Sequence, residues 1–421
     1  MWMKIFNASI YRFLFLLVNF FVSLLVAKLS GATNFGIISL LIVNSAVFLL
    51  ISGLGTDAAI IWHGAKNELS TNQVFSFASF AGIFQLLLFA LLEFFSISFF
   101  DTTLLTQQAS SSFLILEMIY FTGLILVEKY VSLFYALNKA AIANKVLLFV
   151  SSLFFVLLLL GFTGLFTIVN SFLLFCSLIF LQGISVSFVF HYLNNKIKFE
   201  RIKSAHLKSL FHFSAIVFFT NLIQFFAYRS DYWILNYYFG KSEVGIYAQA
   251  CQFAQLLWVA PKIIAALIVP AFLNQPNYER TKFLQLYRVI SIFSIFIIIA
   301  IVLMAAFIYR FFFQVEFSKG FLPLLVMLPG YFLFISTTFF AAYFSIQKKL
   351  WINFINTAFC LIVIISLDFL LIPKSGMMGA AFANSVAYSI AALIMGFQFL
   401  KNEKISIREF WKFQKSDFIL L

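Results

Sequence analysis

Long apolar runs separated by short polar stretches dominate the pattern of residues along this chain of 421 amino acids. A helix needs roughly 20 mostly apolar residues to cross the hydrocarbon core of a bilayer, which is about 30 Å thick. Twelve runs meet this requirement, so the pattern predicts twelve transmembrane helices. The first run is too long for a signal peptide and leads directly into the second, so we expect it to remain as the first helix. The runs centre near Asn19, Phe48, Gln85, Tyr120, Phe155, Ser177, Thr220, Trp258, Phe296, Phe334, Leu361 and Ala387.

Two stretches that lie half a chain apart share one spacing of glycines. Gly31 and Gly36 in SGATNFGII, like Gly240 and Gly245 in FGKSEVGIY, are separated by four residues and precede an apolar run. Gly240 follows Gly31 by 209 residues. The first glycine of each pair is expected to end one helix in a left-handed cap, and the second to let the next helix begin after a tight turn.

A second pair of similar stretches supports an internal repeat. Asn144 in YALNKAAIAN and Asn353 in FSIQKKLWIN are again 209 residues apart. Six predicted helices separate the copies, so both copies face the same side of the membrane. We therefore expect an all-α integral membrane protein with two six-helix bundles in a parallel repeat, a plan with which transporters hold substrate between the halves. The expected domains are an N-terminal bundle (residues 1–195), a cytoplasmic linker (196–209), a C-terminal bundle (210–400) and a basic cytoplasmic tail (401–421).

The composition agrees with a membrane protein and explains the net charge. Hydrophobic residues make up 63% of the chain and charged residues 10%, whereas a soluble domain carries about 25% charged residues. The net charge is +13, and 21 of the 28 Lys and Arg residues fall in the segments on one side of the predicted helices, against five on the other side. The positive-inside rule assigns this side, with both termini, to the cytoplasm. Basic loops beside anionic lipid account for the charge, so no nucleic-acid partner is expected.

The sequence predicts neither a cofactor nor a metal site. Cys176, Cys251 and Cys360 lie singly inside apolar runs, and none shares a metal-binding spacing with the histidines or carboxylates. A phosphate-binding loop of the ATPase type is also absent from the sequence.

The stretch Phe213–Phe272 resembles the seventh and eighth helices of polysaccharide flippases, and Leu29–Leu40 is similar to the turn between their first two helices. The markers in the longer stretch are Asp231, Gly240, the Val-Gly-Ile-Tyr run at Val244–Tyr247, and Pro270. The chain thus resembles the Wzx-like O-antigen and repeat-unit flippases of the MOP exporter superfamily.

The resemblance to these flippases implies both a substrate and a mechanism. The substrate would be a polyprenyl-pyrophosphate oligosaccharide, such as a precursor of lipopolysaccharide O-antigen, moved from the cytoplasmic to the periplasmic leaflet of a bacterial inner membrane. Two six-helix bundles around a central, often cationic cavity would work by alternating access. Membrane lipids, polysaccharide polymerases and chain-length proteins are the partners that this resemblance implies.

Charged residues inside predicted helices are the candidates for a substrate pathway. A charged side chain at mid-membrane costs about 2.5–3.5 kcal/mol on insertion scales and usually faces a cavity or a partner. Arg229, Asp231 and Lys262 fall in the seventh and eighth runs. Arg229 and Asp231 point roughly 200° apart on a helix, so at least one needs another partner. The two cations are suited to a pyrophosphate, although Arg229 as an interfacial side chain and Lys262 as part of a buried ion pair stay open as alternatives.

The first half of the chain offers four further candidates. Arg12 lies near the start of the first run, Asp57 near the cytoplasmic end of the second, and Glu93 and Glu117 in the third and fourth. The two glutamates are candidates for pairing with cations or for proton coupling, or they are neutral and hydrogen-bonded. Asp368, near the end of the eleventh run, is expected at a membrane interface.

Three other functions are weighed against a polysaccharide flippase. An ion-coupled small-molecule exporter of the same superfamily would favour an acidic cavity, whereas the candidates here are largely basic. A peptidoglycan-precursor flippase would be expected to have fourteen spans. A membrane polymerase or glycosyltransferase generally needs a sizeable polar loop outside the bilayer, but the external connections here are short and hold few acidic residues: Asp101, Glu243 and Glu316. We therefore do not expect an enzyme.

Overall fold

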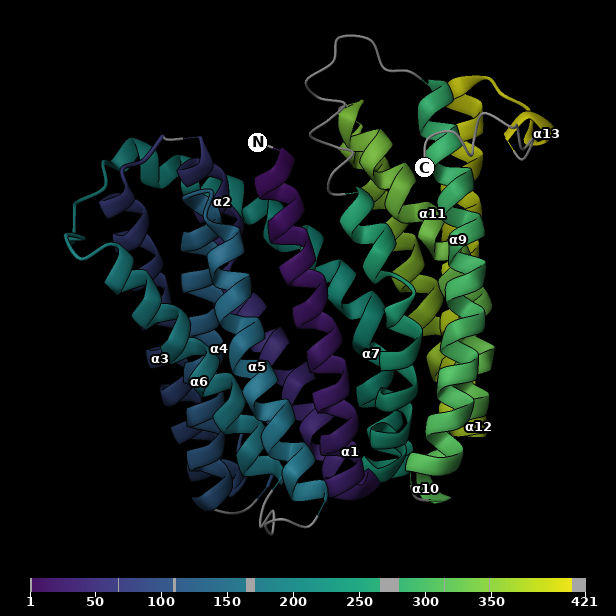
Figure 1. Cartoon of the computed structure of the whole chain (residues 1–421), viewed down its shortest axis with the longest axis horizontal. Coiled ribbons are helices and arrows are strands. Elements are labelled where there is room, and N and C mark those ends of the chain that lie inside the picture. Colours follow the sequence, from purple (N-terminus) through teal and green to yellow (C-terminus); the bar gives the residue numbers. More distant parts are fainter. Residues whose placement is uncertain are drawn as a thin grey trace. The chain divides into compact units, whose positions relative to one another are not determined.

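The computed structural model describes residues 2–66, 68–108, 111–163, 171–265, 280–313, 315–347 and 349–410, and the regular elements within these ranges are helices (Figure 1). Pro270 and residues 411–421 of the expected tail lie outside the described residues. In chain order the helices are α1 (Trp2–Gly53), α2 (Thr56–Ala65), α3 (Thr71–Phe100), α4 (Ser111–Ala136), α5 (Ala140–Phe162), α6 (Ser171–Leu193), α7 (Ser204–Leu256), α9 (Arg280–Phe307), the π-helix η1 (Ile308–Phe312), α10 (Val315–Ser318), α11 (Phe321–Ile346), α12 (Leu350–Glu403) and α13 (Ile407–Phe410).

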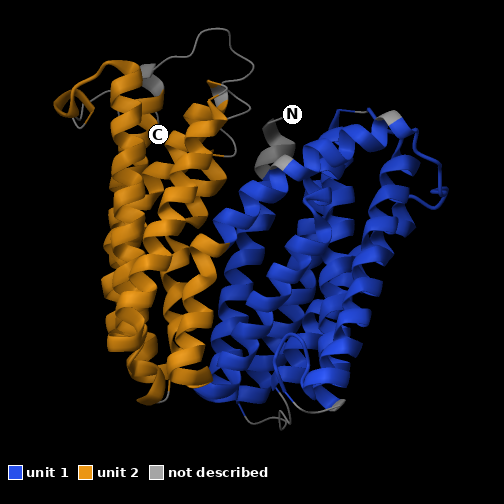
Figure 2. Cartoon of the chain, turned by 180° about the vertical axis from the view of Figure 1, so that it is seen from behind, with its two compact units in different colours: residues 1–225 blue, residues 226–421 orange. Residues whose placement is uncertain are grey.

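The chain divides into two compact units, which Figure 2 shows in different colours. Unit 1 is Met1–Phe225 and unit 2 is Phe226–Leu421, so the boundary between them falls inside α7. Unit 1 therefore contains α1 to α6 and the first part of α7, and unit 2 contains the remaining helices.

Three very long helices, α1, α7 and α12, are each interrupted by a single glycine. Gly31, Gly240 and Gly376 have φ angles of +73°, +79° and +54°. The ψ angles of Gly31 and Gly240 are 171° and −178°, which place both residues in a region that essentially only glycine occupies, and not in the left-handed helical region that we expected. In unit 1, the N-terminus and α2 lie at the same end (Figure 1), so the two parts of α1 run in opposite directions.

The second glycine of each pair does not have the role predicted for it. Gly36 and Gly245 are buried inside the helical segments that follow Gly31 and Gly240, and neither has a positive φ angle. One glycine in the Gly-only region turns the chain within a single residue. The helix therefore resumes at once, and the expected tight turn is not needed.

Eight of the described helical segments are long and apolar enough to cross a membrane. Three of them, Asn7–Gly53, His206–Leu256 and Leu350–Glu403, contain the glycine kinks and have 47, 51 and 54 residues. These lengths are about twice what a single crossing requires. The protein is thus an all-α multi-pass membrane protein, while the count of twelve spans stays a prediction.

Small residues allow helices to approach closely within each unit. In unit 1, a Cβ atom added at Gly123 of α4 would lie 2.5 Å from the Phe180 Cα of α6, and one added at Gly183 would lie 2.6 Å from the Gly123 carbonyl oxygen. In unit 2, a Cβ atom at Gly330 of α11 would lie 2.4 Å from the Ser385 Cα of α12. Such close approach at small residues is typical of helix association in lipid, where apolar burial gives little driving force.

Candidate functional site

A buried polar network in unit 2 surrounds Asp231 of α7. Asp231 is only 2% exposed. Its Oδ2 atom accepts hydrogen bonds from the Tyr247 hydroxyl at 2.5 Å and from the Asn384 Nδ2 at 2.8 Å. Asn384 Nδ2 also lies 2.6 Å from the Tyr247 hydroxyl oxygen. The network therefore joins both sides of the Gly240 kink to the last part of α12.

A second buried carboxylate, Asp368 of α12, belongs to the same network. Asp368 is 1% exposed, and its Oδ2 accepts a hydrogen bond of 3.5 Å from Ser230, the residue before Asp231. Asp368 is thus packed between helices, and its expected position at a membrane interface stays a prediction. Helix α12 continues for two more turns beyond Asp368 to its kink at Gly376.

Each of the two carboxylates has one oxygen without a hydrogen-bond partner. Asp231 Oδ1 and Asp368 Oδ1 are both buried and unsatisfied. A buried carboxylate oxygen without a donor is costly, so a proton or a hard cation would be favourable here. Carboxylate and amide oxygens suit hard cations and not soft metals. Among the described residues, no group of three His, Cys, Asp or Glu residues is placed to hold a metal ion.

Two cations of unit 2 rest on aromatic rings. The Arg229 guanidinium donates a hydrogen bond of 2.7 Å to the Tyr232 hydroxyl and lies 5.0 Å from the centre of that ring. The Lys262 ammonium lies 5.0 Å from the Trp258 ring and 5.9 Å from the Tyr228 ring. In the parts of the chain that the structure describes, neither cation forms an ion pair. Arg229 and Asp231 thus have different hydrogen-bond partners and do not pair with each other.

In unit 1, Glu93 and Glu117 hold the loop between α3 and α4. Both residues are buried, at 1% and 0% exposure. The carboxylate of Glu93 accepts from the Leu104 amide at 3.2 and 3.1 Å. Glu117 accepts from the amides of Leu105 and Thr106 at 3.0 and 2.9 Å, and from the Thr106 hydroxyl at 2.5 Å. The partners of both carboxylates are therefore groups of the loop.

The two other candidates of unit 1 are separate from these glutamates. Asp57 accepts hydrogen bonds from Lys129 Nζ at 3.0 Å on both carboxylate oxygens. The Arg12 guanidinium lies 5.2 Å from the centre of the Phe15 ring. Within unit 1, the predicted site residues therefore have distinct partners and form no single cluster.

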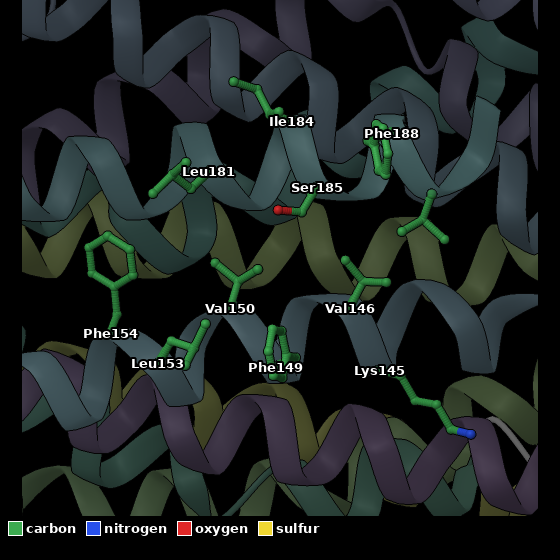
Figure 3. A pocket seen from close by; sticks show the side chains of 11 residues that line it. Lys145, Val146, Phe149, Val150, Leu153, Phe154, Leu181, Ile184, Ser185 and Phe188 are labelled. Atoms are coloured by element: carbon green, nitrogen blue, oxygen red, sulfur yellow. The ribbon is translucent and has the colours of Figure 1, made fainter. Parts of the chain in front are cut away.

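An apolar groove runs between α5 and α6 of unit 1 and encloses about 660 Å³ (Figure 3). Ser185 supplies a hydroxyl among the aliphatic and aromatic side chains of its wall, and Lys145 lies at one end. The Lys145 ammonium is 4.7 Å from the centre of the Tyr11 ring. This lining suits a hydrocarbon chain and offers little to a sugar, so the groove does not complete a polar site. Its lining residues are Lys145, Val146, Phe149, Val150, Leu153, Phe154, Leu181, Ile184, Ser185, Phe188 and Val189.

Comparison with protein families decides the relationship of the chain. The family described as "Polysaccharide biosynthesis protein" matches residues 25–319, which is more than half of the sequence. The chain belongs to the polysaccharide biosynthesis protein family. This match confirms the resemblance found in the sequence. A comparison of the sequence with curated proteins finds no match.

Solved structures show the fold of this polysaccharide biosynthesis protein. A lipid II flippase MurJ in an inward closed conformation aligns with a TM-score of 0.74 at 16% identity, over 98% of this chain and 91% of that one. An inward-facing multidrug resistance MATE transporter of the MOP superfamily aligns with a TM-score of 0.62 at 14% identity, over 94% and 98%. A MOP superfamily transporter from Pyrococcus furiosus aligns with a TM-score of 0.60 at 14% identity, over 96% of both chains. The family member therefore has the fold of MOP transporters.

Proposed function

We propose that this polysaccharide biosynthesis protein is a flippase for polyprenyl-pyrophosphate-linked oligosaccharides. It moves them from the cytoplasmic to the periplasmic leaflet of a bacterial inner membrane, with both of its own termini in the cytoplasm. The observation that carries the proposal is the pair of cations Arg229 and Lys262, which rest on aromatic rings and form no ion pair among the described residues. Family membership and the fold shared with MOP transporters support it.

The chemistry of the two cations fits a pyrophosphate. An aromatic face holds a cation in place without neutralising its charge, as a carboxylate would do. The guanidinium of Arg229 uses one donor on Tyr232, and its other donors are suited to phosphate oxygens. In this proposal the pyrophosphate binds these cations while the polyprenyl tail stays in lipid. The six-helix bundles at residues 1–195 and 210–400 rock against each other, so that the bound substrate is open first to the cytoplasm and then to the periplasm.

A specific observation favours a second candidate, an ion-coupled small-molecule exporter of the same superfamily. The unsatisfied oxygens of Asp231 and Asp368 offer a place for a proton or a hard cation. This network would equally serve a flippase that is driven by an ion gradient, so the substrate and not the ion separates the two candidates.

The test is complementation of a host that lacks its native flippase gene. Surface polysaccharide would be assayed together with the leaflet in which polyprenyl-linked repeat units accumulate. Arg229→Ala and Lys262→Ala are expected to trap complete repeat units on the cytoplasmic face. Arg310→Ala is a matched control, because Arg310 also lies over an aromatic ring, at 5.4 Å from Phe311 in η1.

Three outcomes would overturn parts of this proposal. Repeat units that appear outside but remain unpolymerised in the deletion host would indicate a polymerase. Normal polymer in both cation variants at normal protein levels would exclude the cationic site. If the chain restored efflux of a small cationic drug but no polymer, the exporter would be correct.

A further inference from the structure

Unit 1 contains a buried ionic cluster that the proposed substrate site does not use. Asp57 of α2 and Glu128 and Lys129 of α4 form this buried triad. Lys129 Nζ lies 3.0 Å from both Asp57 oxygens and 3.1 Å from Glu128 Oε2. The Lys129 side chain is 5% exposed, while those of Asp57 and Glu128 are 19% and 26% exposed. The Lys129 ammonium is thus buried, whereas the side chains of Asp57 and Glu128 are partly accessible to solvent.

The buried triad is unbalanced in charge. Two carboxylates face one ammonium, and the further polar contacts are with neutral hydroxyls: Thr56 at 3.5 Å from Lys129 and Ser132 at 3.4 Å from Asp57. The nearby His63 of α2 pairs with Glu68 instead. If both carboxylates were ionised, the cluster would hold an uncompensated negative charge in a region of low dielectric constant, which is unfavourable.

A neighbouring side chain independently lacks a hydrogen-bond donor. Gln85 of α3 is 0% exposed, and its Oε1 is buried without a partner. Its Nε2 donates to the Leu49 carbonyl at 3.2 Å and to the Ser52 hydroxyl at 3.3 Å. A Cβ atom added at Gly53 would lie 3.0 Å from Gln85 Nε2 and 4.0 Å from Asp57 Oδ2, so the amide and the carboxylate flank the same residue. The surroundings of the triad therefore hold acceptors in excess of donors.

We propose that the buried triad is a proton-binding site, in which Glu128 takes up one proton while Asp57 stays ionised against Lys129. Asp57 has both oxygens on the ammonium, accepts from Ser132, and lies in the first turn of α2, where the helix dipole favours an anion. Glu128 approaches Lys129 with one oxygen, which makes no hydrogen bond. The proton comes from water and forms an O–H bond on Glu128, which brings the triad to neutrality.

The helix that carries Asp57 also contacts the part of α7 that belongs to unit 1. A Cβ atom added at Gly55, which precedes α2, would lie 2.5 Å from the Ser214 carbonyl oxygen. The ring of Trp62 in α2 stacks on Phe213 with centroids 5.4 Å apart. Proton uptake by the triad changes the attraction between α2 and α4 and, through α2, the support of α7. Coupling of this proton to transport rests on the proposed function, whereas proton binding itself does not.

Infrared titration of the purified full-length protein tests proton binding without any substrate. With ¹³C-labelled glutamate, the wild type is expected to show a protonated carboxyl band that disappears as the pH is raised, because burial disfavours the ionised form of a carboxyl group. Glu128→Gln should lose the part of this band that Glu128 contributes, whereas any part from the other buried glutamates, Glu93 and Glu117, should remain. Glu68→Gln should keep the Glu128 part, because the Glu68 side chain is 44% exposed and pairs with His63. Identical spectra for Glu128→Gln and the wild type at every pH would overturn the proposal.

A second variant keeps the test decisive if Glu128→Gln does not fold. Asp57→Asn leaves one carboxylate opposite one ammonium, so Glu128 should stay ionised and its band should be lost although the residue is present. Persistence of the band in Asp57→Asn would contradict the charge balance described here. If the band followed sodium concentration at constant pH, the site would bind a metal cation and not a proton.

Flipping measured in proteoliposomes with and without a pH gradient then tests the coupling. The wild type should flip faster with the gradient, and Glu128→Gln should lose this acceleration. Failure of the wild type to flip any polyprenyl-linked oligosaccharide would refute the proposed function but leave the infrared result intact. Acceleration preserved in Glu128→Gln would refute the coupling alone.

Discussion

The amide of Asn384 is expected to be a major support of the buried network in unit 2. Asn384→Ala removes the hydrogen bond of 2.8 Å to Asp231 and the contact of 2.6 Å with Tyr247. Two ordinary bonds between helices of a membrane protein contribute about 0.6 kcal/mol each. A bond to an ionised acceptor contributes about 1.5–3 kcal/mol. Because Asn384 is 3% exposed and water cannot replace it, we expect a loss of about 2–4 kcal/mol in the free energy of unfolding.

The measurement is an unfolding titration of the purified protein with SDS in mixed micelles, followed by tryptophan fluorescence. Asn34→Ala is the matched control, because Asn34 is exposed and its hydrogen bond of 3.1 Å to the Ser30 carbonyl, on the other side of the Gly31 kink, can be replaced by water. It should leave the transition unchanged. Asn384→Asp should destabilise more than Asn384→Ala, since it adds a third carboxylate beside Asp231 and Asp368. A loss of about 1 kcal/mol or less for Asn384→Ala would refute the idea that this amide stabilises an ionised carboxylate.

Three further predictions concern the framework of the units. Glu117→Gln should weaken the anchoring of the loop 101–108 by about 1–3 kcal/mol, and limited proteolysis of membranes should then cut this loop faster; an unchanged rate would contradict the anchoring. Gly123→Leu should lower the melting temperature strongly, because even its Cβ would lie 2.5 Å from a backbone atom of α6, whereas Gly396→Ala, at 3.5 Å from a Phe ring, should be tolerated. Gly31→Ala should cost about 1–3 kcal/mol through its backbone alone, since no atom lies within 4 Å of the added Cβ; equal stability in a denaturant titration would argue against the positive φ angle.

The membrane class and the family could be predicted from the sequence because they depend on local patterns. Apolar runs of sufficient length exclude a soluble fold whatever the packing is. The turning points at Gly31 and Gly240 could be located from the repeat. Their conformation could not, because the same Gly-x4-Gly spacing is compatible with a capped turn of several residues and with a reversal at one residue. The third kink, at Gly376, lies within a run of more than fifty helical residues.

The partners of the site residues were much harder to predict, because they come from distant segments. The spacing of Arg229 and Asp231 indicates that they need separate partners, but it does not indicate which ones. Asn384 is 153 residues from Asp231 and is an ordinary amide in an apolar run. Lys129 follows Glu128 in the sequence and is buried against Asp57, which lies 72 residues earlier. A charged pair beside an apolar run was the available signal that it belongs inside the bundle.

The way in which Glu93 and Glu117 hold one loop limits how unit 1 can move. Glu93 is on α3 and accepts a hydrogen bond from the Leu104 amide. Glu117 is on α4 and accepts from the next two amides, those of Leu105 and Thr106. Sliding of α3 along α4 would break these bonds, and water would not replace them because both carboxylates are buried. The two helices and their connection should therefore travel as a single hairpin during any transport cycle. A disulfide across this hairpin would leave its motion unimpaired, whereas one that joins it to another hairpin of unit 1 would report whether the bundle itself deforms.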